Sequence, residues 1–432
     1  MNAVSFGRIF AVLLTTCSAQ YAFASSSDCQ VGDKNTWMRS EYADCSFQHI
    51  QEVFPVRTVA HSAKLAREFR HADISAALRY TFAGQPRSID EFMRRTRAKA
   101  VVFASNNTLL LERYAGGANE ETSFLTFSIT KSIVSTLVGV AIDRHLIGSV
   151  DDRVDAYKKD LADTAYRDVR IRDLMMMASG TSFNENYDDP NSSIAKFFGL
   201  VNRNQGGLYE YVRSFGSERP AGTVFRYSSA DTEVLGAVLE SATHEHLADF
   251  ASQELWSRVG AEADAYWVLD APDGREVSAG GFSARARDLA RFGMVFADAE
   301  KKREDGGIVS RAWIRDAITP QRQFAEFGNL SAGRGIVPGA DLGYGYQWWL
   351  RRSPDLTVVA MGMYGQFILI DPKRGSVLVV TSAWERPYIR EHYEEVLALF
   401  ESLQTSIDSA CQVRLKKKGA VSQRVRPEWC AV

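Results

Sequence analysis

A serine and a lysine three residues apart, Ser128 and Lys131, stand at the start of an apolar run in FLTFSITKSIVSTLVG, residues 124–139. Residues with this spacing share one face of a helix, so both side chains would point into the same space. The positive field at a helix N-terminus favours an oxyanion and lowers the pKa of a nearby lysine. A neutral lysine amine can then take the serine proton, so the pair predicts a nucleophile with its own base.

Two alternatives compete with this interpretation. Ser128 could simply be a helix cap, and the same spacing recurs at Ser193 and Lys196 in NSSIAKFF. The context favours the first pair, because IVSTLVGVAI after Lys131 is apolar nearly all round and predicts a central, buried helix. The segment AKFFGLVNRN is typical of an ordinary amphipathic helix, and Ser192 or Ser193 would cap it.

A tyrosine further along the chain could complete such a site. Tyr227 lies in RYSSADTEVLG, after a proline–glycine turn and a short extended run. A tyrosine placed before a helix can present its hydroxyl to a cleft and relay a proton to the leaving group. The alternative is a buried core tyrosine without a chemical role.

Glycines at the head of a predicted strand form the third element. In GMYGQFILIDP, Gly362 and Gly365 flank Met363 and Tyr364. Glycines at such a position let a ligand approach the backbone, although a simple bend in the strand is the alternative. The N–H of the next residue, Gln366, could then form an oxyanion hole together with the N–H of the proposed nucleophile.

Other chemistries find little support. No G-x-S-x-G motif occurs, and the seven histidines lie in segments without a triad signature. His244 and His246 could bind a metal, but the sequence suggests no third ligand nearby, so we predict no metal site. The net charge is −2, from 51 basic and 53 acidic residues, so no nucleic-acid partner is predicted.

The N-terminus predicts export to the periplasm. Arg8 precedes the run IFAVLLTTCSA, which is too short to span a bilayer, and AFA at residues 22–24 fits a signal-peptidase site. Residues 1–24 are therefore a predicted signal peptide. The alternatives are a buried N-terminal helix and a lipoprotein acylated at Cys17. No other segment is apolar and long enough to cross a membrane.

Four cysteines remain after this cleavage: Cys29, Cys45, Cys411 and Cys430. An even number in an exported chain favours disulfides over free thiols, with three possible connectivities. We predict the sequence-local pairs, Cys29–Cys45 and Cys411–Cys430, which would staple the two ends of the chain.

The elements that must position these residues are strands early and late in the chain, with helices between them. KAVVFASNNTLLLERYAGG, residues 99–117, predicts a β-hairpin, and strands dominate after about residue 340. Short turns between strands favour an antiparallel sheet flanked by helices, an α/β fold of the α+β type. The predicted N-terminal extension covers residues 25–98. A discontinuous α/β domain follows over residues 99–160 and 276–410, with a mainly helical domain, residues 161–275, inserted in it. A basic tail covers residues 411–432.

In this order, S-x-x-K, Y-S-S and a glycine-flanked strand start resemble the motifs of the serine β-lactamase and penicillin-binding-protein superfamily, on its class C and esterase side. The resemblance covers roughly residues 95–405 and is supported by GTVFRYSSADTEVLG, GGFSARARDLARFG and YGYQWW. Within the superfamily the chain looks closest to the 6-aminohexanoate-dimer hydrolases, which cut a linear amide. The resemblance implies a β-lactamase/transpeptidase-like fold and no cofactor.

The resemblance also implies roles for the matching residues. Ser128 would be the acylated nucleophile, Lys131 its proton partner and Tyr227 a second acid/base. The backbone N–H groups of Ser128 and Gln366 would bind the oxyanion.

Substrate contacts follow from the same resemblance. MASGTSFNENYDDP is similar to a loop whose tyrosine closes over bound substrate, which here is Tyr187. Tyr364 and Gly365 would be further substrate-binding residues. They stand, with Met363, where penicillin-directed members have Lys-Thr-Gly, and Tyr-Ser-Ser replaces Tyr-x-Asn. Both departures count against strong β-lactam turnover.

The sequence therefore predicts an exported serine hydrolase that cleaves an amide or ester bond of a small molecule through an acyl-enzyme. One alternative is a penicillin-binding-like module that binds peptides or cell-wall fragments without turnover. Another is a cell-wall peptidase or β-lactamase.

Overall fold

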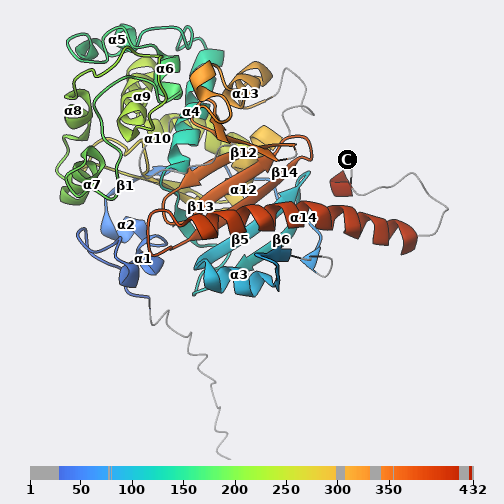
Figure 1. Cartoon of the computed structure of the whole chain (residues 1–432). Coiled ribbons are helices and arrows are strands. Elements are labelled where there is room, and N and C mark those ends of the chain that lie inside the picture. The colour runs from blue at the N-terminus through green and yellow to red at the C-terminus, as the bar shows by residue number, and fades with distance from the viewer. Residues whose placement is uncertain are drawn as a thin grey trace, which may run out of the picture.

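An eight-stranded sheet runs through the described part of the protein (Figure 1). The computed structural model describes residues 29–75, 78, 80–297, 307–330, 342–353, 355–417 and 428–430. Neighbouring strands of this sheet are antiparallel, except for the parallel pair β6 and β2. In spatial order the strands are β10 Leu342–Tyr344, β11 Trp349–Ser353, β12 Asp355–Gly362, β13 Gln366–Asp371, β14 Ser376–Ser382, β5 Ala98–Ser105, β6 Thr108–Tyr114 and β2 Arg70–His71.

The middle of this sheet is buried on both faces because its strands are apolar almost throughout, as in VVFA of β5, FILI of β13 and VLVV of β14. Successive side chains of a strand point to opposite faces. Val102 accordingly belongs to the core on the side of α12 (Ala286–Ala297), and Val101 belongs to the core on the side of α14 (Arg390–Lys417) and α3 (Ile89–Arg95) (Figure 1).

A second, four-stranded antiparallel sheet leads into the segment that holds Ser128. Its strands, in spatial order, are β1 Val56–Val59, β8 Ala265–Val268, β9 Phe282–Arg285 and β7 Ser123–Leu125. The first described helices, α1 (Ser40–Ser46) and α2 (Ile50–Val53), lead directly into strand β1 of this sheet. The predicted N-terminal extension is thus hydrogen-bonded to distant strands through β1 and β2.

Helices fill the chain between β7 and β8, as the sequence predicts. The central one is α4 (Ile129–Asp143), which is buried on nearly every side and packs against α9 (Ser229–Thr243). The others in this part are α5 Val154–Tyr157, η2 Lys159–Leu161, α6 Ile171–Met175, α7 Ser193–Arg203, α8 Leu208–Arg213, α10 Leu247–Ala251, η3 Ser252–Trp256 and α11 Ser257–Val259. Outside it lie the small sheet of β3 Tyr80–Phe82 and β4 Gln85–Arg87, with α13 Arg311–Ala317, η4 Gln323–Ala325 and η5 Glu428–Cys430.

The predicted fold class is confirmed: a mainly antiparallel sheet is flanked by helices, and the predicted hairpin is found as β5 and β6. Both sequence-local cysteine pairs are bonded, with Cα–Cα distances of 5.4 Å for Cys29–Cys45 and 5.7 Å for Cys411–Cys430. Within the described residues, every helix is too short or too polar to cross a membrane. The predicted signal peptide lies outside the described residues, as do residues 418–427 of the basic tail.

Candidate active site

Ser128 lies at the junction between β7 and α4, where the chain turns sharply. Phe127 has a left-handed backbone with φ of +47°, an uncommon conformation for a bulky residue. Ser128 occupies the N-cap position of α4, but its side chain accepts no hydrogen bond from a backbone N–H in the first turn of the helix. The Ser128 hydroxyl therefore does not cap the helix. Capping was the main alternative to a chemical role for this residue.

Lys131 points back at Ser128 from the first turn of α4. Its Nζ lies 2.9 Å from the Oγ of Ser128 and donates to the carbonyl oxygen of Ala279 at 2.7 Å. The lysine is only 1% exposed. Burial lowers its pKa from 10.5 to about 8, against the opposite influence of the carboxyl groups of Glu185 and Glu233. This arrangement supplies an amine that can be neutral near physiological pH, within hydrogen-bonding distance of a serine hydroxyl.

Glu233, which the sequence reasoning did not single out, fixes the carbonyl partner of Lys131. Its carboxyl oxygen accepts the backbone N–H of Ala279 at 2.8 Å. Burial raises the pKa of Glu233 to about 8. The only signal in the sequence is its place in YSSADTEVLG, six residues after Tyr227. Its partner Ala279 lies 46 residues away, so no local pattern reveals their contact.

Tyr227 is brought to the same place, as the sequence predicts. Its ring stacks on Trp349 with centroids 5.5 Å apart, and the Nζ of Lys131 lies 5.2 Å from the centroid of the Tyr227 ring. Burial raises the pKa of Tyr227, against the opposite influence of its hydrogen bond with Ser128. The group is therefore a neutral phenol, able to donate a proton. Ser228 caps α9 by accepting the N–H of Asp231, which fixes Tyr227 just before the helix.

Tyr187 approaches the site from the loop between α6 and α7. Its hydroxyl donates to Glu185 at 2.7 Å. The same carboxylate accepts the N–H and the hydroxyl of Ser229, at 2.9 Å and 2.7 Å. Burial raises the pKa of Tyr187. Glu185 and Ser229 thus tie the loop to the start of α9, a link that no local sequence pattern signals.

The predicted glycine turn joins β12 to β13 and lies against the segment before Ser128. A Cβ on Gly362 would lie 2.2 Å from the carbonyl oxygen of Thr126, so only glycine allows this approach. Tyr364 and Gly365 turn the chain with φ of +59° and +87°. The side-chain amide of Gln366 holds the turn by donating to the carbonyl oxygens of Ser382 and Tyr364, at 2.7 Å and 3.2 Å.

A cavity opens beside Ser128. Of the predicted site residues, the cavity brings together Ser128 and Tyr187, whereas Tyr364 packs its ring against Phe127 and Gly365 lies against Trp384. The lining residues are Trp37, Ile50, Phe54, Leu125, Phe127, Ser128, Tyr187, Phe197, Phe198, Val201, Ser229, Val268, Val277, Ala279, Gly280, Gly281 and Met363.

The second S-x-x-K match has the ordinary structure that its context predicts. Ser192 caps α7 by accepting the N–H of Ala195 at 3.2 Å. Ser193 is half-buried, and Lys196 is exposed on the helix surface. The pair of Ser193 and Lys196 therefore lacks a buried amine such as that of Lys131 beside Ser128.

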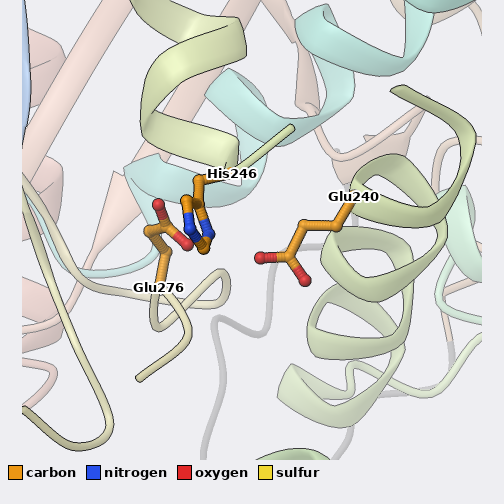
Figure 2. Close-up of side chains that lie close together, drawn as sticks. All are labelled: Glu240, His246 and Glu276. Atoms are coloured by element: carbon orange, nitrogen blue, oxygen red, sulfur yellow. The ribbon is translucent and has the colours of Figure 1, made fainter. Parts of the chain in front are cut away.

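A histidine and two glutamates that do not line the cavity lie close together (Figure 2). In the described part of the chain, the possible ligand atoms of His246, Glu240 and Glu276 all lie within 4.8 Å of one another. The sequence-based argument that no third ligand lies near His246 is therefore wrong, because Glu276 comes from a distant segment. Arg57 pairs with Glu276 at 2.7 Å and Arg275 pairs with Glu240, so two arginines already balance the two carboxylates. We assign no metal to this ionic cluster.

Comparison with known proteins shows which family this chain resembles. The family described as Beta-lactamase matches residues 86–399. The curated 6-aminohexanoate-dimer hydrolase of Paenarthrobacter ureafaciens is 26% identical over 364 residues, which are 82% of this chain and 89% of the relative. Among solved structures, a protein of Bacillus anthracis assigned as a 6-aminohexanoate-dimer hydrolase has a TM-score of 0.75 and 23% identity, covering 89% of this chain and 97% of that chain.

A more distant fold neighbour is a family VIII carboxylesterase, with a TM-score of 0.54 and 16% identity, covering 72% of this chain and 96% of that chain. The family match spans well over half of the 432 residues. This chain belongs to the Beta-lactamase family and has the fold of its hydrolases.

Proposed function

We propose that this protein is a serine hydrolase that cleaves an ester or amide bond of a small molecule through an acyl-enzyme, with Ser128 as the nucleophile and Lys131 as its base. The observation that carries the proposal is the 2.9 Å contact between the Ser128 hydroxyl and a buried lysine whose pKa is about 8. A depressed pKa at a nucleophile–base pair is typical of a catalytic site.

In the proposed acylation step, the neutral amine of Lys131 takes the hydroxyl proton as the Oγ of Ser128 bonds to the carbonyl carbon. The tetrahedral intermediate collapses when its bond to the leaving oxygen or nitrogen breaks, and the leaving group receives a proton from the phenol of Tyr227. Lys131 returns its proton to that phenol. Water then attacks the ester at Ser128, releasing the acid and restoring the hydroxyl.

We assign the oxyanion hole to the backbone N–H groups of Ser128 and Gln366. The close approach of Gly362 to Thr126 supports this assignment, since it brings the β12–β13 turn against the segment that ends in Ser128. Backbone donors fixed in this way stabilise the negative charge that develops on the carbonyl oxygen.

The direct test is reaction of the purified protein with a fluorophosphonate probe, followed by peptide mapping. Modification at Ser128, lost in Lys131→Ala, is the expected result. Modification at Ser193 instead, or no reaction of the folded protein, would refute the assignment.

The relatives point to amides and esters as substrates. One is named for hydrolysis of a 6-aminohexanoate dimer, and another is a carboxylesterase. We also propose that the protein is exported to the periplasm, which the two disulfides support because they persist in oxidising compartments. Intact mass of the mature protein checks this: a start at Met1 would contradict export.

Tyr227→Phe is expected to lower kcat by about 10²-fold, the usual scale for loss of a general acid. The phenol lies beside Lys131 and is neutral, so phenylalanine removes the donor while keeping the ring on Trp349. Steady-state kinetics on an ester measures the effect. Tyr344→Phe is the matched control, because this buried ring lies 6.4 Å from that of Tyr227. Equal kcat values for Tyr227→Phe and the unmodified enzyme would exclude the role.

Tyr187→Phe is expected to weaken turnover of an amide several-fold more than turnover of an ester with the same acyl group. The change breaks the hydroxyl contact with Glu185 and loosens the loop over the cavity. An amide has the poorer leaving group and depends more on exact positioning. Comparing a p-nitroanilide with the corresponding p-nitrophenyl ester measures this ratio. Equal losses on both substrates would argue against a role in loop closure.

A further inference from the structure

One wall of the cavity beside Ser128 comes from the start of the chain. Trp37, Ile50 and Phe54 form this wall, and Phe197 and Val201 of α7 face it from another element. The segment lies outside the family match, which begins at residue 86. The cavity is therefore shaped by a part of the chain that the family description does not include.

Trp37 is held rigidly in this wall. It is 3% exposed, and its ring lies parallel to that of Phe127, next to the serine, with centroids 6.0 Å apart. The ring of Phe54 packs edge-on against the Trp37 ring, with centroids 5.4 Å apart. The indole N–H donates to the side chain of Asn202 on α7 at 3.0 Å, so its one polar group is satisfied. A buried, fixed aromatic side chain of this kind offers a preformed apolar surface.

A disulfide encloses the segment that carries Trp37. Cys29 and Cys45 lie on either side of it in the sequence, 16 residues apart. Within the loop, the N–H of Gly32 donates to the hydroxyl of Ser46 at 2.9 Å, and a Cβ on Gly32 would lie 2.7 Å from the backbone of Trp37. The disulfide thus limits the freedom of the loop that supplies the wall.

The cavity has no charged side chain among its described lining residues. An ammonium or carboxylate group placed there would lose its hydration without gaining an oppositely charged partner from the lining, which is costly. An apolar chain would gain free energy by leaving water. Tyr227, the proposed acid for the leaving group, does not line the cavity. This is the arrangement expected if the cavity receives the acyl side of the scissile bond and Tyr227 serves the other side.

Resting on the acyl-enzyme function above, we propose that this cavity is the acyl subsite for an uncharged, apolar chain, and that Trp37 is a specificity-determining residue. Trp37 acts by contact with the acyl chain of the substrate and not by proton transfer. The substrate class is therefore esters or amides of apolar carboxylic acids.

A series of p-nitrophenyl esters tests the class, because the leaving group stays constant. We expect kcat/KM to rise about 10- to 100-fold from acetate to hexanoate, since each buried methylene favours binding by about fourfold at most. The 6-aminohexanoate ester differs from hexanoate by a terminal ammonium group, and we expect it to be at least about 10-fold poorer. A higher kcat/KM for the acetate or for the ammonium ester than for hexanoate would overturn the proposal. It would also be overturned if, in a series of alkyl acetates, kcat/KM rose in the same way with the length of the alcohol.

Variants test whether Trp37 determines the preference for apolar acyl chains. Trp37→Ala is expected to lower kcat/KM for hexanoate by about 10-fold or more and for acetate by less than about twofold, and Trp37→Phe is expected to keep most of the preference. The pair Cys29→Ser with Cys45→Ser should reduce the hexanoate-to-acetate ratio, whereas Cys411→Ser with Cys430→Ser, the matched control, should not. Equal loss on both esters in folded Trp37→Ala would contradict the assignment.

The two proposals fail differently. The acyl-enzyme function is wrong if Ser128→Ala hydrolyses the esters as well as the unmodified protein does. It is also wrong if the unmodified protein neither hydrolyses them nor reacts with the fluorophosphonate probe. If hydrolysis depends on Ser128 but shows no preference for apolar acyl chains, only the subsite is wrong. The ester series needs no variant, so a poorly folding Trp37→Ala would not leave the proposal untested.

Discussion

Ser128→Ala is expected to lower kcat/KM for p-nitrophenyl hexanoate by at least about 10³-fold, because loss of a nucleophile removes the acyl-enzyme pathway itself. The Ser128 hydroxyl does not cap α4, so its removal costs the helix no capping bond. Circular dichroism and thermal unfolding should therefore match those of the unmodified protein. This combination of lost turnover and retained fold separates a chemical role from a structural one.

Ser193→Ala is the matched control for this experiment. Ser193 starts the second S-x-x-K sequence, but the cap of that helix is Ser192. We expect kcat/KM to remain within about twofold of the unmodified value, as for a substitution outside the site. Full turnover by Ser128→Ala, or a large loss in Ser193→Ala, would exclude Ser128 as the nucleophile.

The second large effect is expected at Lys131, in the pH dependence of the reaction. Burial lowers the pKa of this amine from 10.5 to about 8. Below pH 8 the amine is mostly protonated and cannot accept the proton of Ser128, and above pH 8 it is mostly neutral. The value of kcat/KM should therefore fall about tenfold per pH unit below pH 8 and level off above it. A rate independent of pH between 6 and 9 would contradict a lysine base.

Lys131→Ala is expected to lower kcat/KM by about 10³-fold or more, in line with loss of the base from a nucleophile–base pair. Lys131→Arg should be equally impaired, because a guanidinium stays protonated throughout the accessible pH range. Lys196→Ala is the control at the other S-x-x-K sequence, where the lysine is exposed. Fluorophosphonate labelling of the same variants reports activation of the serine independently of substrate binding.

The local patterns of the sequence determined the local parts of this protein. The three-residue spacing of Ser128 and Lys131 sufficed to place the two side chains together, because a helix fixes the geometry of neighbouring turns. Apolar runs with turn residues between them predicted β5, β6, β13 and β14, and the sequence-local cysteine pairs were correct. The order of the motifs also pointed to the family that the comparison shows.

Contacts between distant segments were decided only by the tertiary structure. Lys131 donates to Ala279, 148 residues away, and Trp37 donates to Asn202, 165 residues away. The cluster of Glu240, His246 and Glu276 was likewise missed. No periodicity or spacing signals such pairs, because they depend on which faces of separate elements pack together. The sequence alone therefore predicted that Ser128 and Lys131 lie together, whereas packing of residues 37–54 against α7 decided the shape and the apolar character of the cavity beside them.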